Sequence, residues 1–121
     1  MSYIVKMGEK PDMLQVLNLI KELAVFEKEP DAVLLTESDL LRDGFGKGPL
    51  FKTFVAELEG KIVGMALFYP RYSTWKGKTI HLEDLIVQKD KRGLGIGKAL
   101  YTKVLQYAYA KEVKRVEWAV L

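Results

Sequence analysis

The chain has 121 residues, a formal net charge of +3, 49% hydrophobic and 29% charged residues, which suits one globular domain spanning 1–121. The absence of cysteine excludes a disulfide framework, a thiolate nucleophile and a cysteine-ligated zinc site, and we expect no bound metal. A net charge this small gives no reason to expect a nucleic-acid partner. The sequence has no signal-peptide pattern and no apolar run near the roughly 18 residues of a membrane span, so we expect a cytoplasmic protein without a membrane partner.

The first part of the chain predicts a strand and two helices. Residues 3–7 read as a strand, and Pro11 then fits the first turn of a helix that ends before Pro30. Thr36, with Asp39 three residues later, is a near-match to a capping box and predicts a short second helix. Glycines at the end of that segment are expected to terminate it.

The second part predicts four strands and one long helix. Strands are expected over 50–58, 61–69, 79–88 and 115–121, and a helix over 99–110. The first two of these strands form a hairpin, and the helix crosses over to a parallel last strand. The order β-α-α-β-β-β-α-β therefore predicts an α/β (α+β) fold, with a mixed, mostly antiparallel sheet and helices on both faces.

A glycine-rich loop lies between the strand over 79–88 and the long helix. It reads Lys91-Arg92-Gly93-Leu94-Gly95-Ile96-Gly97-Lys98. Its glycines allow the backbone to approach a ligand closely, and the first N–H groups of the following helix favour an anion. The loop thus predicts a phosphate site, and a tight turn that binds nothing is the alternative.

The spacing of the loop excludes two common phosphate motifs. A Walker loop needs Ser or Thr where Ala99 stands, and a dinucleotide fingerprint needs its third glycine one residue later. What remains is Arg92-x-x-Gly95-x-Gly97. This pattern resembles the pyrophosphate loop of the GCN5-related N-acetyltransferases (GNAT), which bind acetyl-CoA.

Other segments resemble one subfamily, the diamine acetyltransferases, which include the spermidine/spermine and thialysine enzymes. The segments are Ile20-Lys21-Glu22-Leu23-Ala24, Phe26-Glu27, Leu35-Thr36-Glu37, residues 40–46, Trp75-x-Gly77-Lys78 and Leu82-Glu83-Asp84. The resemblance spans nearly the whole chain. It implies the GNAT acyl-CoA N-acyltransferase fold, a homodimer, and direct transfer of acetyl from acetyl-CoA to a primary amine of a small molecule: a diamine, a polyamine or a lysine- or thialysine-like amine.

The sequence departs from the family in two places, one that concerns the substrate and one that concerns the length of the domain. Ser73 stands where polyamine enzymes carry an acidic residue, which weakens the expectation of a polycationic substrate. The family also continues past the strand over 115–121 with further strands and a catalytic tyrosine. We therefore expect a domain that is incomplete at its C-terminus, with those strands absent.

Glu83 is the candidate general base. An acceptor amine with a pKa near 10.4 carries a proton at neutral pH, and a nearby carboxylate can remove it. Glu83 also matches the position of the family's proposed base. Because neighbours on a regular strand point to opposite faces, we expect Asp84 to face away from Glu83. Histidine occurs once, as His81, and is assigned no role.

The resemblance also implies the remaining site residues. The cofactor residues are Leu85, Ile86, Val87, Arg92, Gly93, Leu94, Gly95, Ile96, Gly97 and Lys98, and the pantetheine arm is expected between the fourth and last strands. The substrate residues are Phe26, Glu27, Glu83, Glu117, Trp118 and Ala119. Two other functions stay open: an acetyl-CoA-binding module without catalysis, and a nucleotide- or phosphate-binding domain without acyl chemistry.

Overall fold

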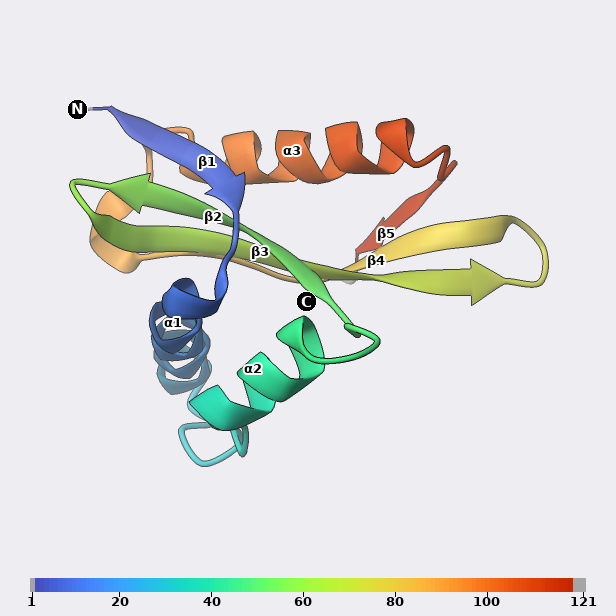
Figure 1. Cartoon of the computed structure of the whole chain (residues 1–121). Coiled ribbons are helices and arrows are strands. Elements are labelled where there is room, and N and C mark those ends of the chain that lie inside the picture. Colours follow the sequence, from blue (N-terminus) through green and yellow to red (C-terminus); the bar gives the residue numbers. More distant parts are fainter. Residues whose placement is uncertain (1, 119–121) are drawn as a thin grey trace.

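A five-stranded sheet forms the middle layer of the protein in the computed structural model, which describes residues 2–118 (Figure 1). The strands are β1 (Tyr3–Met7), β2 (Lys52–Leu58), β3 (Lys61–Ser73), β4 (Gly77–Val87) and β5 (Val116–Trp118), in the spatial order β1-β2-β3-β4-β5. The first four pair antiparallel and β5 runs parallel to β4. The mixed, mostly antiparallel sheet is thereby confirmed.

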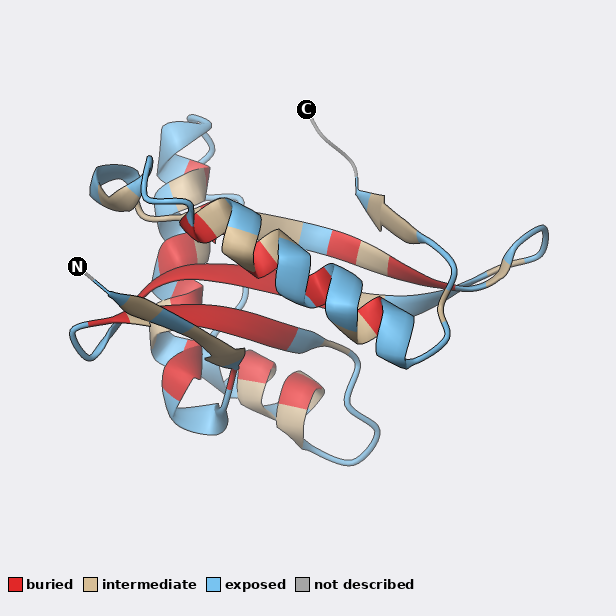
Figure 2. Cartoon of the chain, turned by 90° about the horizontal axis from the view of Figure 1, so that it is seen from above, coloured by how far each residue is buried: buried red, intermediate tan, exposed pale blue. Residues whose placement is uncertain are grey.

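Helices cover both faces of this sheet, as expected (Figure 1). The helices are α1 (Met13–Phe26), α2 (Glu37–Phe45) and α3 (Ile96–Ala110), and short 3-10 turns precede α1 (Lys10–Asp12) and α3 (Lys89–Lys91). One core lies between α3 and the sheet and includes Phe68 and Leu82. A second core lies beneath α1 and α2 and includes Met13 and Met65. Most of β2 and residues 62–68 of β3 are buried, so both faces are covered in that part of the sheet (Figure 2).

The predicted capping box fixes the start of α2. The backbone N–H of Asp39 donates to Thr36 Oγ1 at 3.2 Å, and the backbone N–H of Thr36 donates to Asp39 Oδ2 at 2.9 Å. These hydrogen bonds hold the pKa of Asp39 below its ordinary value, since they stabilise the ionised carboxylate. The start of α2 is therefore set locally, and α2 then forms one wall of a cavity described below.

The hairpin of β3 and β4 is longer than the sequence predicts. β3 continues to Ser73 rather than stopping at 69, and β4 begins at Gly77, so the hairpin projects beyond the other strands (Figure 1). The Ser73 hydroxyl accepts hydrogen bonds from the backbone N–H groups of Trp75 and Lys76, which closes the tip. The extra length brings polar side chains of β3 alongside those of β4.

Candidate active site

The glycine-rich loop forms the predicted strand-to-helix turn, but its last part is helical. Gly93 and Gly95 have φ angles of 87° and 81°, a region that glycine adopts without strain. Gly95 caps α3, which begins at Ile96 rather than at residue 99. The first hydrogen bond of the helix runs from the Ala99 N–H to the Gly95 carbonyl, at 3.0 Å. The N–H groups of residues 96–98 thus belong to the first turn, where backbone donors lack helical partners.

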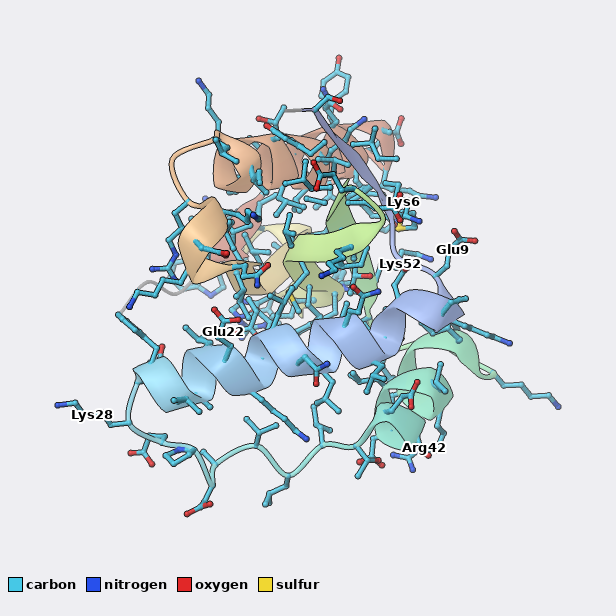
Figure 3. All side chains as sticks on the ribbon, turned by 90° about the vertical axis from the view of Figure 1, so that its left-hand side faces the viewer. Lys6, Glu9, Glu22, Lys28, Arg42 and Lys52 are labelled. Carbon is cyan, nitrogen blue, oxygen red and sulfur yellow. The ribbon has the colours of Figure 1, made fainter. Side chains whose placement is uncertain are left out.

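Close packing holds this turn against the sheet. Ile96 is buried, and a Cβ atom placed on Gly64 of β3 would lie only 3.0 Å from Ile96 Cγ2. On the other side, Glu22 points from α1 toward the segment before the loop and accepts a hydrogen bond from the Lys89 N–H at 3.3 Å (Figure 3). The donors at the start of α3 are therefore held in a fixed position.

A cleft of about 380 Å³ opens between this turn, the end of β4 and α1. Its lining residues are Leu23, Leu85, Ile86, Val87, Lys91, Arg92, Gly93, Gly95, Ile96 and Gly97. The structure thus brings together all the predicted cofactor residues except Leu94 and Lys98, which are exposed beside the cleft. Because the Ile96 side chain belongs to the core, its contribution to the cleft is limited to the backbone.

Arg92 connects the loop to the end of α1. Its Nε donates to the Val87 carbonyl at 3.3 Å, and its guanidinium carbon lies 5.8 Å from the centre of the Phe26 ring. Phe26, predicted from the resemblance to contact the substrate, therefore stands beside a predicted cofactor residue at the mouth of the cleft. This placement leaves its predicted role untested.

A β-bulge in β4 places both candidate carboxylates on one face of the sheet. Leu67 of β3 pairs with Asp84 and Phe68 pairs with Leu82, so Glu83 is the extra residue. The expectation that Asp84 faces away from Glu83 is wrong, because it assumed a regular strand. Both line one cavity of about 560 Å³ under α1 and α2. Its other lining residues are Ile20, Leu35, Leu40, Asp43, Leu50, Phe51, Leu67, Tyr69 and Pro70.

The two carboxylates differ in their surroundings. Burial, and then the nearby charges of Glu83 and Glu27, raise the pKa of Asp84 above its ordinary value. Glu83 is half exposed and accepts a hydrogen bond at 3.1 Å from the hydroxyl of Tyr69 on β3. Burial and that hydrogen bond raise the pKa of Tyr69, which keeps its hydroxyl a donor at neutral pH. Glu83 is thus the more accessible base of the two.

The remaining predicted substrate residues lie at different distances from this cavity. Glu27, at the end of α1, is close enough to Asp84 to affect its pKa. Glu117 forms an ion pair with Arg115 at 3.7 Å, on the strand next to β4. The ring of Trp118 packs against Tyr101 of α3 at 5.6 Å between ring centres, hence on the opposite face of the sheet.

One substrate prediction and one cofactor prediction fall outside the described residues. Ala119 is one of residues 119–121, which lie outside the described part of the chain, and the predicted separation of the fourth and last strands also depends on those residues. The described pairing of β4 with β5 runs from Ile80 and Val116 to Leu82 and Trp118.

Sequence reasoning named Tyr69 as a possible lining residue of the amine site and gave His81 no role, and it connected neither of them, nor Arg71, with Glu83. Tyr69 and Arg71 lie on β3, and His81 lies on β4 two residues before Glu83. Residues two apart on a strand point to the same face, so the sequence spacing could have predicted that His81 lies beside Glu83. The contacts of the two β3 residues gave no signal, because they depend on the register between strands.

Within residues 2–118, no group of three or more His, Cys, Asp or Glu side chains is arranged to hold a metal ion. None of the helices that the structure describes is long and apolar enough to cross a membrane.

Comparisons with known proteins agree with the fold and the motifs. Residues 13–121 match the model of the acetyltransferase (GNAT) family. The chain is 39% identical over 126 residues to a thialysine N-epsilon-acetyltransferase of Bos taurus, an alignment that covers 98% of this chain and 74% of the relative. It is 40% identical over 124 residues to the human spermidine/spermine N(1)-acetyltransferase-like protein 1, covering 97% of this chain and 18% of that protein.

A solved structure shows the same fold. The crystal structure of an aminoglycoside N-acetyltransferase in complex with CoA superposes with a TM-score of 0.78 at 18% identity, covering 99% of this chain and 78% of the other. At that identity, the likeness shows the shared fold alone.

Proposed function

Since the chain belongs to the acetyltransferase (GNAT) family and resembles its diamine acetyltransferases, we propose that it transfers the acetyl group of acetyl-CoA to a primary amine of a small molecule. The acceptor is a diamine, a polyamine or a lysine- or thialysine-like amine. The names of the relatives in cattle and human support that class. The resemblance also supports a homodimer.

The loop cleft fits a pyrophosphate group. Gly93 and Gly95 adopt positive φ angles that favour glycine, and glycine has no side chain to block the loop backbone. Gly97 likewise has no side chain that would cover the backbone N–H groups in the first turn of α3. The backbone N–H groups of that turn have no helical partners, so they can donate hydrogen bonds to a bound anion. Arg92 adds a fixed positive charge at the mouth. Leu85, Ile86 and Val87 would lie along the pantetheine arm.

Glu83 supplies the base that the reaction needs. An alkylammonium with a pKa near 10.4 must lose a proton before it attacks, which costs about 4.6 kcal/mol at pH 7 at about 1.36 kcal/mol per pH unit. Glu83 accepts this proton directly or through a water molecule. The carboxyl groups of Glu83, Asp84 and Asp43 line the cavity, and such a lining favours a cationic acceptor.

The reaction balances around these residues. When bound, acetyl-CoA supplies a thioester whose carbonyl carbon accepts the amine. A C–N bond forms and the C–S bond breaks. The ammonium gives up two protons, of which one goes to the Glu83 carboxylate and the other ends on the departing thiolate. A backbone N–H of β4 would stabilise the negative charge that develops on the carbonyl oxygen.

One observation carries the proposal: β4 passes through both cavities in succession. Glu83 and Asp84 line the carboxylate cavity, and Leu85, Ile86 and Val87 line the loop cleft directly after them. An amine held at the carboxylates and a thioester held along the next residues would therefore meet. An acetyl-CoA-binding module without catalysis needs the cleft but not this adjacency.

A turnover screen tests the proposal. Acetyl-CoA and the purified chain are incubated with polyamines, diamines, lysine, thialysine and aminoglycosides, and release of the free thiol is followed. We expect release with at least one small diamine or lysine-like amine. Affinity for CoA without turnover on any amine would favour the binding module, and a nucleotide that binds as tightly as CoA would favour a phosphate-binding domain. Light scattering on the same sample tests the homodimer.

A further inference from the structure

A polar cluster of β3 and β4 surrounds Glu83, and the proposed reaction does not yet use it. The Nδ1 atom of His81 lies 3.4 Å from Nη1 of Arg71, and its Nε2 atom lies 3.6 Å from Oε1 of Glu83. Tyr69 is paired directly with His81 across the strands, and their ring centres are 5.2 Å apart. The imidazole is thus held between a guanidinium on one side and a carboxylate on the other.

The contact with the Arg71 guanidinium determines which ring nitrogen of His81 carries the proton. Arg71 carries only donors and stays charged at every physiological pH, so the nitrogen beside it must accept. Nδ1 of His81 is that nitrogen. A neutral imidazole that accepts through Nδ1 carries its proton on Nε2, which faces Oε1 of Glu83. The Tyr69 hydroxyl donates to the same oxygen at 3.1 Å.

The other charges near the imidazole do not compete for this proton. Glu117 of β5 is the register partner of His81, but it pairs with Arg115 at 3.7 Å. Within residues 2–118, Glu83 is the one carboxylate within 4 Å of the ring nitrogens. The groups that face His81 are therefore Arg71 and Tyr69 from β3, Glu83 from β4 and Glu117 from β5.

We propose that Arg71 and His81 are positioning residues for Glu83. Arg71 fixes the Nε2–H tautomer of His81, and this N–H acts with the Tyr69 hydroxyl to hold Oε1. Among the described residues no hydrogen bond reaches Oε2, which leaves that oxygen to take the amine proton. The catalytic consequence rests on the proposed function, whereas the tautomer of His81 does not.

The first test reads the tautomer and needs no activity. His81 is the single histidine of the chain, so two-bond ¹H–¹⁵N correlations report one imidazole without assignment. We expect the neutral Nε2–H form in the wild type and a mixture of tautomers in Arg71→Met. The matched control is Arg42→Met, which removes the same charge from α2, where Arg42 pairs with Asp39 and Asp43, and should leave the spectrum unchanged. An Arg71→Met spectrum identical to the wild type would overturn the proposal.

The second test measures kinetics on whichever amine the screen identifies. His81→Leu removes the Nε2–H, whose nitrogen lies 3.6 Å from Oε1 of Glu83, a distance that we expect to shorten to that of a hydrogen bond when substrate binds; kcat should then fall about tenfold, with KM for acetyl-CoA unchanged. His81→Gln places an amide N–H near the position of Nε2 and should recover most of kcat. A purely structural role for His81 predicts that both variants fail alike, and that result contradicts the proposal.

The two tests separate the proposal from the proposed function. If no amine is acetylated, the proposed function fails while the tautomer comparison still decides the Arg71–His81 contact. If turnover is found and Glu83→Gln abolishes it, but His81→Leu turns over like the wild type, the positioning role is refuted and the proposed function stands.

Discussion

Replacing Gly97 by alanine should affect stability and cofactor affinity in opposite directions. Gly97 lies in the first turn of α3, and a Cβ atom there would sit 3.7 Å from Val87 Cγ2, an ordinary van der Waals contact. Alanine is favoured over glycine in a helix, and its unfolded chain has less entropy to lose. The free energy of unfolding should therefore rise by roughly 0.5 to 1 kcal/mol.

The same methyl group would occupy part of the loop cleft. Gly97 and Val87 both line it, so a carbon between them takes space that the account assigns to the cofactor. We expect the affinity for CoA to fall at least tenfold, about 1.4 kcal/mol. Isothermal titration calorimetry measures the affinity, and urea unfolding measures the stability of the same variant.

A second variant distinguishes an effect on the cleft from a general effect of changing α3. Gln106→Ala also changes α3, but at an exposed position near its other end, and it should leave CoA affinity unchanged. Unchanged affinity in a stably folded Gly97→Ala protein would refute the idea that the pyrophosphate lies against the first turn of α3.

Three further predictions concern the carboxylate cavity. Glu83→Gln should lower turnover most near pH 7 and less near pH 10, where the amine loses its own proton; an even drop across the pH–rate profile would count against a base role. Asp84→Asn should raise the free energy of unfolding at pH 7. The pKa of Asp84 is raised in the folded protein, so the wild type loses stability as the pH rises through that pKa, and the neutral amide does not. In urea titrations below the ordinary carboxyl pKa range, where Asp84 is protonated, the difference between variant and wild type should vanish. A lysine-like amine or short diamine should have a higher kcat/KM than spermine, since Ser73 replaces an anchor worth roughly 1 kcal/mol when partly exposed; the reverse order in competition assays would refute this.

Local signals predicted most of the fold. The cap at Thr36 and the glycines of the loop fix conformations within a few residues, so the sequence is enough to place them. The element order followed from apolar periodicity. Element ends were less predictable: α3 begins at Ile96 because Gly95, and not a residue after the last glycine, takes the left-handed cap position.

The geometry of the carboxylates could not be predicted locally. The bulge at Glu83 arises from the register between β3 and β4, and one extra residue moves Asp84 to the same cavity. Sequence alternation alone therefore assigned Asp84 to the wrong face. The contact between Arg71 and His81 has the same origin, since it joins two strands at a hairpin that is longer than the apolar pattern indicates.

The most direct test of the central claim is a crystal structure of the chain with CoA and an accepted amine. The account predicts that the pyrophosphate lies against residues 92–98 and that the amine nitrogen lies within about 3.2 Å of Glu83 or one water away. A different apolar cavity of about 400 Å³ exists near the other end of α3, lined by Phe68, Ile80 and Tyr107. CoA bound in that cavity, or an amine nitrogen remote from Glu83, would contradict the account.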